Sequence, residues 1–265
     1  MLINDHFQNY KRYNVRKAQL VIADIPYNIG INAYGSNPSW YKGGDNKNGE
    51  SDLAGTEFFD TDKDFRITEF LHFCSKLLIK EPKEKGKAPC MIVFCAFEQQ
   101  FELIEKAKRY GLNNYINLVF RKNFSAQVLK ANMRVVGNSE YGLIFYRDKL
   151  PKFNNNGKMV MNVMDWKRDT QTEKIHPTQK PIELLENLIR IFTDEGDVVI
   201  DPCAGSGSTL MAADNLNRKN YGFEIKKDFF KEATRLITVN KIKKEEIREV
   251  GYSKTELEKI NPILF

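Results

Sequence analysis

The sequence predicts an α/β protein built on a doubly wound, mostly parallel sheet. Short apolar runs rich in β-branched residues alternate with segments that carry apolar residues at helical spacing, which is typical of such sheets. Two sequences rich in polar and turn-forming residues, 24–27 and 201–209, each lie at the end of a predicted buried strand. Because ligands bind such sheets at the carboxyl ends of the strands, the two sequences indicate a single site.

Length and composition favour a single domain, 1–265. The chain has 265 residues, and 41 Lys and Arg against 35 Asp and Glu give a net charge of +6, which is compatible with a polyanionic partner. Its four cysteines form no C-x-x-C pair and histidines are few, so we expect no metal site and a reducing, cytoplasmic location. No apolar run approaches the roughly 20 residues that span a membrane, and the first residues lack the character of a signal peptide.

The first half of the chain predicts strands and helices in alternation. Residues 19–23 are mostly apolar, as in a buried strand, and 67–79 carries apolar residues at helical spacing. Gly111 suits a helix end because glycine adopts positive φ without strain. In this half we expect strands at 1–3, 19–23, 90–97 and 115–120, and helices at 67–79 and 98–110.

The second half continues the pattern. Pro181 suits the first position of a helix whose apolar face runs from Ile182 to Phe192 and which ends before Gly196. The β-branched residues 198–200 predict a buried strand. In this half we expect strands at 141–146, 198–200 and 221–224, and helices from 181, from 208, at 228–239 and at 255–260.

Two long segments lack a helix or strand pattern. Segment 29–64 is rich in Gly and Asn, and it carries aromatic residues and lysines beside the sequence 24–27. We interpret it as a mobile loop that covers substrate, with a disordered surface insertion as the alternative. Segment 121–174 is rich in Lys and Asn, which favours either a solvated loop or a surface that contacts a nucleic acid.

The glycine-rich sequence 201–209 suits a nucleoside cofactor. Gly205 and Gly207 allow positive φ and a close approach of backbone to ligand, and the helix that follows directs its free N–H groups at the loop. Glu224 ends the next strand about 20 residues on, where an acid accepts hydrogen bonds from ribose hydroxyls. Leu210 replaces the third glycine of a dinucleotide site, and no lysine follows as in a phosphate-binding loop. The loop therefore indicates S-adenosylmethionine, with an ordinary strand–turn–helix corner as the alternative.

The sequence Asp24-Ile25-Pro26-Tyr27 suits catalysis at an exocyclic amine of a nucleobase. Such an amine is a poor nucleophile, and acceptors for both of its hydrogens favour a pyramidal nitrogen that attacks a methyl donor. The Asp24 carboxylate supplies one acceptor, and a backbone carbonyl that Pro26 holds in place supplies the other. Tyr27 offers a ring on which a flipped-out base can stack. A strand that ends in an Asx-Pro turn is the alternative.

Taken together, these residues resemble the β class of S-adenosylmethionine-dependent DNA amino-methyltransferases. That class carries a D/N/S-P-P-Y motif, then a target-recognition region, then H-P-T-x-K-P, and then D-P-F-x-G-S-G-T. This sequence has 24–27, 176–181 and 201–208 in that order, and the resemblance covers about residues 1 to 235. It implies a Rossmann-like methyltransferase fold of circularly permuted motif order, with seven strands of which one is antiparallel. It also implies that 121–174 recognises the target sequence.

The resemblance implies a role for each matching residue. Asp24, Ile25, Pro26 and Tyr27 match the catalytic motif, although Ile25 stands where a proline is usual. The residues expected at the cofactor are Asp201, Cys203, Gly205, Ser206 and Gly207 of the loop, Glu224 at the ribose, His176, Thr178 and Lys180 near the methionine part, and Asp5 near the adenine. Cys203 replaces a common aromatic residue, so we expect the packing around the cofactor to change.

The resemblance further implies methyl transfer to N6 of adenine in DNA, because Asp leads the catalytic motif. N4 of cytosine in DNA, a base in RNA and a glutamine side chain are alternatives with the same chemistry. An inactive DNA-binding relative and a nicotinamide oxidoreductase are alternatives of other classes. Relatives in this class are often dimers, so a homodimer is an expectation, and a cognate restriction endonuclease is another.

Overall fold

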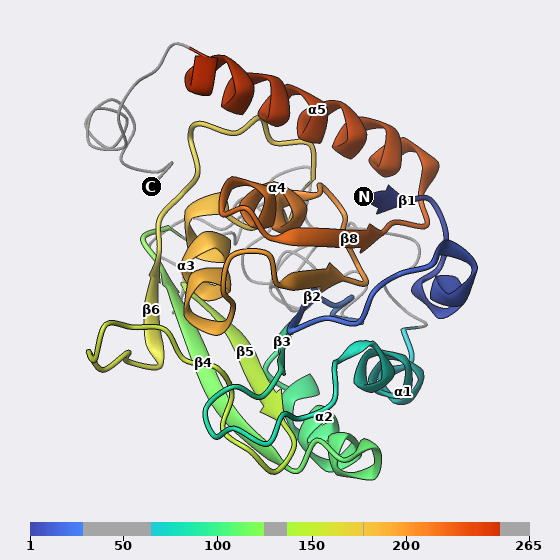
Figure 1. Cartoon of the computed structure of the whole chain (residues 1–265), viewed down its shortest axis with the longest axis vertical. Coiled ribbons are helices and arrows are strands. Elements are labelled where there is room, and N and C mark those ends of the chain that lie inside the picture. The colour runs from blue at the N-terminus through green and yellow to red at the C-terminus, as the bar shows by residue number, and fades with distance from the viewer. Residues whose placement is uncertain (29–64, 125–136, 177, 250–265) are drawn as a thin grey trace, which may run out of the picture.

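The protein is described by a computed structural model that covers residues 1–28, 65–124, 137–176 and 178–249 (Figure 1). An eight-stranded sheet has the order β1-β8-β7-β2-β3-β5-β4-β6. Its strands are β1 (Leu2–Ile3), β2 (Leu20–Asp24), β3 (Cys90–Cys95), β4 (Asn114–Lys122), β5 (Ser139–Tyr146), β6 (Val163–Trp166), β7 (Val198–Asp201) and β8 (Lys219–Phe223).

The sheet is mostly parallel, as predicted. Among the described strands only β5 runs against its neighbours, since it pairs antiparallel with both β3 and β4. The sheet has eight strands rather than seven because β6 pairs with β4 inside segment 121–174, which has no strand pattern. Trp166 is the one buried residue of this short edge strand, so pairing and a single anchor hold it in place.

Helices follow most of the expected ranges. They are η1 (Phe7–Tyr13), α1 (Ile67–Leu77), α2 (Gln99–Ala107), η4 (Lys108–Tyr110), α3 (Ile182–Phe192), α4 (Ser208–Asn215) and α5 (Lys227–Glu249). Helix η1 is unexpected, and α5 continues ten residues past the predicted end at 239. Pro181 has extended ψ and precedes the first turn of α3. The helix expected at 255–260 lies outside the described residues. No helix in the described ranges is long and apolar enough to cross a membrane.

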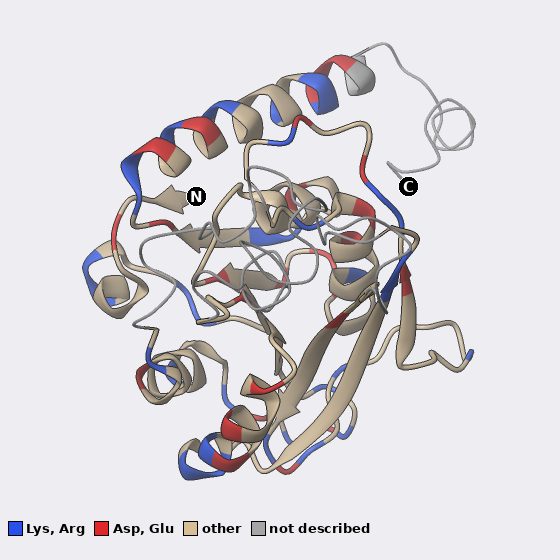
Figure 2. Ribbon diagram, turned by 180° about the vertical axis from the view of Figure 1, so that it is seen from behind, with Lys and Arg blue, Asp and Glu red and all other residues tan. Residues whose placement is uncertain are grey.

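Two apolar layers enclose the sheet. Successive residues of β2 point to opposite faces, so Val21 packs towards η1, α1 and α2, whereas Ile22 packs towards α3, α4 and α5. Helix α5 lies along the outer side of the molecule and presents alternating acidic and basic residues (Figure 2). Strands buried on both faces explain the nearly continuous apolar runs of β2, β3 and β7.

The topology brings the two predicted sequences together. Strands β2 and β7 are parallel neighbours, with Val21 opposite Ile200. Their carboxyl ends therefore lie at the same edge of the sheet, and the sequence that follows β2 faces the glycine-rich loop that follows β7. The predicted meeting of the two strand ends is confirmed.

Candidate active site

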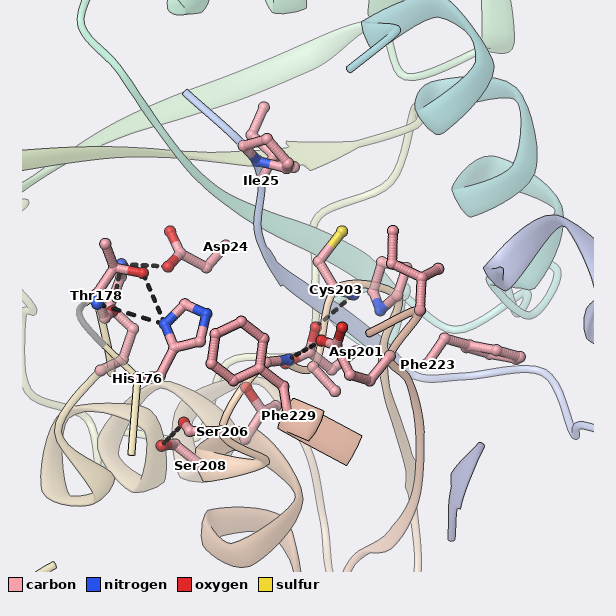
Figure 3. Close-up of a pocket in the computed structure, with 18 of the residues that line it drawn as sticks. Asp24, Ile25, His176, Thr178, Asp201, Cys203, Ser206, Ser208, Phe223 and Phe229 are labelled. Atoms are coloured by element: carbon pink, nitrogen blue, oxygen red, sulfur yellow. Dashed lines mark hydrogen bonds and ion pairs between the residues drawn. The ribbon is translucent and has the colours of Figure 1, made fainter. Parts of the chain in front are cut away.

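A pocket lies at the carboxyl ends of β2, β7 and β8 (Figure 3). Its walls are the sequence 24–27, the loop 176–180 before α3, the start of α4 and the end of β8. The pocket is open to solvent on one side, and side chains from three strand ends and from two loops line it.

The glycine-rich loop closes one side of this pocket. The Cys203 amide donates to Asp201 Oδ1 over 2.9 Å, and Gly205 adopts a positive φ of 49°. A Cβ atom at Gly205 would lie 3.4 Å from His176 Nε2, so the loop packs closely on the loop before α3. Ser206 is buried and its hydroxyl bonds that of Ser208 at 2.8 Å. Burial raises the pKa of Asp201 to about 7, against hydrogen bonds from Thr209 and Cys203 that lower it.

Gly207 is not among the residues that line the pocket, and the cofactor role expected for it stays a prediction. It precedes α4 with φ of 75°, and a Cβ atom there would lie 2.9 Å from Ile237 Cδ1 of α5. Its lack of a side chain therefore serves the turn and the packing of α5 against the loop.

Glu224 joins the end of β8 to the glycine-rich loop. Its Oε2 accepts the Gly205 amide at 2.9 Å and its Oε1 accepts the Lys226 amide at 2.7 Å. Burial raises the pKa of this carboxyl, and the backbone hydrogen bonds oppose that rise. Each oxygen retains acceptor capacity towards the pocket.

His176 packs against the glycine-rich loop, and Thr178 lies beside His176. The Thr178 amide donates to His176 Nδ1 at 3.3 Å, and the ring packs on Phe229 with centroids 4.7 Å apart. Burial and three nearby lysines, of which Lys180 acts most strongly, lower the pKa of His176 to about 4. The imidazole is therefore neutral at physiological pH.

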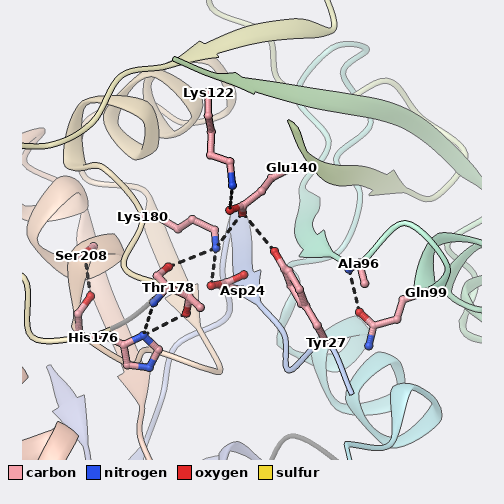
Figure 4. Close-up of polar contacts among 11 residues, drawn as sticks. Asp24, Tyr27, Ala96, Gln99, Lys122, Glu140, His176, Thr178, Lys180 and Ser208 are labelled. Atoms are coloured by element: carbon pink, nitrogen blue, oxygen red, sulfur yellow. Dashed lines mark hydrogen bonds and ion pairs between the residues drawn. The ribbon is translucent and has the colours of Figure 1, made fainter. Parts of the chain in front are cut away.

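Asp24 points into the pocket, and its two carboxylate oxygens differ in their hydrogen bonding (Figures 3 and 4). Oδ2 accepts from Lys180 Nζ at 2.6 Å. Oδ1 is buried and has no hydrogen-bond partner among the described residues. Burial raises the pKa of Asp24 to about 6, Lys180 lowers it, and Glu140 raises it further. The carboxylate is thus ionised near pH 7 and keeps one acceptor oxygen for a ligand.

The residues after Asp24 are fixed through their backbone. The Ile25 amide donates to the Phe94 carbonyl at 3.3 Å, and the Pro26 carbonyl accepts from Gln99 Nε2 at 2.8 Å. Gln99 is itself held by the Ala96 amide at 3.0 Å. Nothing in the sequence marked Gln99, because its partner carbonyl lies far from it in the chain.

Lys180 lines the pocket, and its expected place near the methionine part of a cofactor stays a prediction. Its side chain is only 6% exposed, and its ammonium is shared between Asp24 Oδ2 and Glu140 Oε2, the latter at 3.3 Å. It borders the pocket, but its charge is turned towards the catalytic motif. Glu140, from β5, is a member of the site that the sequence analysis missed, and an acid in an otherwise apolar strand is the signal that could have found it.

Comparison with known proteins decides the family, because residues 18–235 match the model of a protein family described as DNA methylase. The chain belongs to the DNA methylase family. The resemblance inferred from the three motifs is confirmed.

Several relatives of this DNA methylase are themselves methyltransferases. It is 27% identical to the DNA adenine methyltransferase YhdJ of Escherichia coli K12, over 95% of this chain and 87% of that one. It is 39% identical to the Type II methyltransferase M2.DpnII of Streptococcus pneumoniae, over 33% and 34% of the two chains.

Solved structures share the fold of this DNA methylase. The M1.HpyAVI–SAM complex has a TM-score of 0.61 at 19% identity, over 89% of this chain and 98% of that one. The cytosine-N4-specific PvuII DNA methyltransferase has a TM-score of 0.64 at 16% identity, over 99% and 92%. At these identities the likeness concerns the fold, and the predicted Rossmann-like methyltransferase architecture is confirmed.

In this DNA methylase Asp5 is not among the residues that line the pocket, and its expected contact with the adenine stays a prediction. Its carboxylate accepts from Tyr13 Oη at 2.6 Å, Asn9 Nδ2 at 2.8 Å and the His6 amide at 2.7 Å. Of these, the Tyr13 bond contributes most to holding the pKa of Asp5 at about 2. Asp5 thus holds η1 together, and the next two residues, His6 and Phe7, line the pocket instead.

The two long segments of the DNA methylase are only partly described. Segment 29–64 lies outside the described residues, but its flanks are joined: Asn28 Nδ2 donates to the Phe65 carbonyl at 3.1 Å, and the Phe65 amide donates to Asn28 Oδ1 at 3.3 Å. Within 121–174 the structure describes 121–124 and 137–174. Lys152 there is buried against Asp194 and Asp197, so it belongs to the fold rather than to a binding surface.

Proposed function

We propose that this DNA methylase transfers a methyl group from S-adenosylmethionine to N6 of adenine in DNA. The observation that carries the proposal is the buried Oδ1 of Asp24, which has no hydrogen-bond partner within the described part of the chain and lies in the same pocket as Gly205 and Glu224. A buried acceptor that faces such a pocket indicates a donor supplied by a ligand.

The charges of the pocket suit a cationic cofactor. The carboxyl groups of Asp24, Asp201 and Glu224 line it, whereas the ammonium of Lys180 is engaged by two acids and His176 is neutral. A sulfonium and an α-ammonium group are attracted to such a lining, and the pyrophosphate of a nicotinamide cofactor is repelled. When bound, S-adenosylmethionine supplies an electrophilic methyl carbon.

In this proposal each wall of the pocket has one task. Glu224 accepts hydrogen bonds from the ribose hydroxyls, while the backbone at Gly205 gives the ligand close access. Asp24 Oδ1 and the Ile25 carbonyl accept the two hydrogens of the target amine, and the Tyr27 ring stacks on the base. Because a base in a duplex cannot enter such a pocket, the target must be flipped out.

The reaction balances with these groups alone. The lone pair of the adenine N6 forms a bond to the methyl carbon, the carbon–sulfur bond breaks, and its electrons stay on sulfur to give S-adenosylhomocysteine. The methylated nitrogen then loses one proton to solvent. The ionised Asp24 stabilises the positive charge that develops on N6 before that loss.

Two observations support adenine as the target. Asp leads the catalytic motif, and the relative that matches along most of the chain is named a DNA adenine methyltransferase. N4 of cytosine remains the competing target, since the exocyclic amines of both bases present two hydrogens to Asp24 and Ile25. A fold neighbour is named cytosine-N4-specific.

The proposal predicts that Asp24→Ala reduces methyl transfer by at least about 10²- to 10³-fold, because the acceptor that orients the amine is lost. S-adenosylmethionine binding should change little, since Glu224 and the glycine-rich loop are intact. Transfer is measured with labelled cofactor, and the product by mass spectrometry of nucleosides from the methylated DNA. Asp148→Ala, which removes an exposed aspartate, is the matched control.

Three outcomes would contradict this assignment. Parental turnover in Asp24→Ala would remove the catalytic role. N4-methylcytosine in place of N6-methyladenine would move the reaction to the competing target. Transfer to neither base in DNA by the parent protein would overturn the proposal as a whole.

The proposed setting is cytoplasmic DNA. A cognate restriction endonuclease is part of this proposal, and relatives of the chain are named Type II methyltransferases. A homodimer is part of the same proposal, and sedimentation of the purified protein with and without DNA tests it.

A further inference from the structure

Glu140, the second residue of β5, lies behind the catalytic motif at the centre of a buried polar cluster (Figure 4). Its Oε1 accepts from Lys122 Nζ at 3.0 Å. Its Oε2 faces Lys180 Nζ and the Tyr27 hydroxyl, each at 3.3 Å. The carboxylate therefore holds three donors that come from three separate parts of the chain.

The cluster is balanced in charge. Asp24 and Glu140 oppose Lys180 and Lys122, and the lysine side chains are 6% and 8% exposed. Burial pushes the pKa of Glu140 up, but the two lysines outweigh it and leave that pKa below its ordinary value. Buried charges persist only when they are paired, so loss of the Glu140 charge unbalances the groups around Asp24.

The position of Lys180 depends on both acids. Its ammonium sits 2.6 Å from Asp24 Oδ2 and 3.3 Å from Glu140 Oε2, and it also reaches the Thr178 carbonyl at 3.4 Å. Because the lysine stays on Oδ2, the other oxygen of Asp24 has no partner among the residues that the structure describes. Without Glu140, the ammonium is free to move across the carboxylate and take the oxygen that the proposed reaction uses.

We infer that Glu140 is a positioning residue of the methyl transfer, which holds Lys180 on one oxygen of Asp24 and holds the Tyr27 ring beside the base. The inference rests on the proposed function. Glu140 acts through Lys180 and Tyr27, and it is not among the residues that line the pocket.

Because charged groups surround Asp24, the inference predicts how the pH dependence of methyl transfer changes when one of them is removed. The groups that act on its carboxyl are Lys180 from the loop before α3, Glu140 from β5 and Tyr27 after β2. Asp24 in turn raises the pKa of Asp201, Cys95 and Cys203, which face it from β7, β3 and the glycine-rich loop. Lys122 acts through Glu140.

Glu140 and Lys180 shift the pKa of Asp24 in opposite directions. Asp24 has a pKa of about 6 and must be ionised to accept the amine, so activity falls as pH drops through 6. Glu140 raises that pKa, so Glu140→Gln should move the acid limb of the rate profile to lower pH. Lys180 lowers the pKa, so Lys180→Met should move the acid limb to higher pH.

The experiment compares the parent protein with Glu140→Gln and Lys180→Met. In Glu140→Gln we expect the plateau value of kcat to fall about 10- to 100-fold, which is typical when a reacting group is misplaced by an ångström. We expect KM for S-adenosylmethionine to stay within about twofold, because Glu140 does not line the pocket. Glu102→Gln, which removes an exposed glutamate of α2, is the matched control and should behave as the parent.

A second measurement does not depend on turnover. Carboxyl carbon NMR of the free protein follows the titration of Asp24 directly, and thermal unfolding with S-adenosylmethionine binding shows that each variant is folded. We expect the Asp24 midpoint to move down in Glu140→Gln and up in Lys180→Met. Parental kcat and an unmoved midpoint in folded Glu140→Gln would overturn the inference. A fall in kcat with an unmoved midpoint would also overturn it, since that result assigns Glu140 a merely structural part.

Failure of the inference is distinct from failure of the proposed function. If the parent protein methylates DNA and folded Glu140→Gln does so equally well, the positioning role is wrong and the function stands. If the parent protein methylates no DNA, the proposed function fails, and the NMR midpoints still report whether Glu140 and Lys180 set the charge of Asp24.

Discussion

Glu224 shows how one residue can serve the loop and the ligand together. Its carboxylate already holds the Gly205 amide, so a change at this position alters the shape of the loop as well as the contact with the ribose. Glu224→Ala should weaken S-adenosylmethionine binding by about 2 kcal/mol, or roughly 30-fold in Kd, since it removes an acceptor and leaves the partly buried Gly205 amide without that acceptor. Isothermal titration calorimetry measures this loss.

Glu224→Gln is the informative companion. Gln retains one acceptor oxygen for the Gly205 amide, so most of the loop geometry should survive and the loss of affinity should be smaller than in the alanine variant. Equal Kd values for the parent and Glu224→Ala would refute the ribose role.

Residues that act through neighbours in sequence were predictable, and residues that act across the sheet were not. Asp24, Gly205 and Glu224 follow strands in recognisable patterns, and the structure places all three in one pocket. The pairing of Lys180 with Asp24 was not predicted, because nothing local in the sequence reveals it. Glu140 was missed for the same reason.

At the scale of elements, the packing of α5 on the glycine-rich loop depends on Gly207. Gly207→Ala should destabilise the protein by about 2 kcal/mol: roughly 1 for an alanine at positive φ, and about 1 for the contact that its methyl group makes with Ile237. Gly157→Ala is the matched control, because Gly157 has φ of 72° with no atom near its missing Cβ. Urea unfolding gives the free energy of unfolding of both variants. Equal losses in the two variants would show that α5 accommodates the added methyl group without loss of stability.

The elements that the sequence missed are those without a pattern of their own. Helix η1 is organised by the Asp5 carboxylate, and β6 is held by its pairing with β4. Both depend on partners distant in the chain or on side-chain hydrogen bonds. By contrast, β2, β3 and β7 are buried on both faces, and their nearly continuous apolar runs can be recognised in the sequence.

At the scale of the whole molecule, the orientation of β6 suggests which basic residues meet DNA. Strand β6 runs in the same direction as β2. Lys167 and Arg168 follow β6, so they lie at the same end of the sheet as Asp24. Both are exposed, and they belong to the basic segment that follows β6 (Figure 2). Lys108, also exposed, lies between α2 and the start of β4, at the opposite end of the sheet.

The double variant Lys167→Ala, Arg168→Ala should therefore weaken DNA binding and reduce the slope of log affinity against log salt by about 2, one for each phosphate contact. Fluorescence anisotropy over a series of salt concentrations measures both. Lys108→Ala is the control and should keep the parental slope. A parental slope in the double variant would exclude this edge as the DNA surface.

The order of the sheet also has a consequence for synthesis. β7 lies between β2 and β8, yet it is made long after β2. On the ribosome, β2 leaves the exit tunnel early. The side of β2 that pairs with β7 has no strand partner until β7 has also left the tunnel. Asp24 likewise waits for Lys180. A nascent chain of this architecture therefore exposes an apolar strand for most of its translation, and its yield in cells should respond to the chaperones that shield such strands.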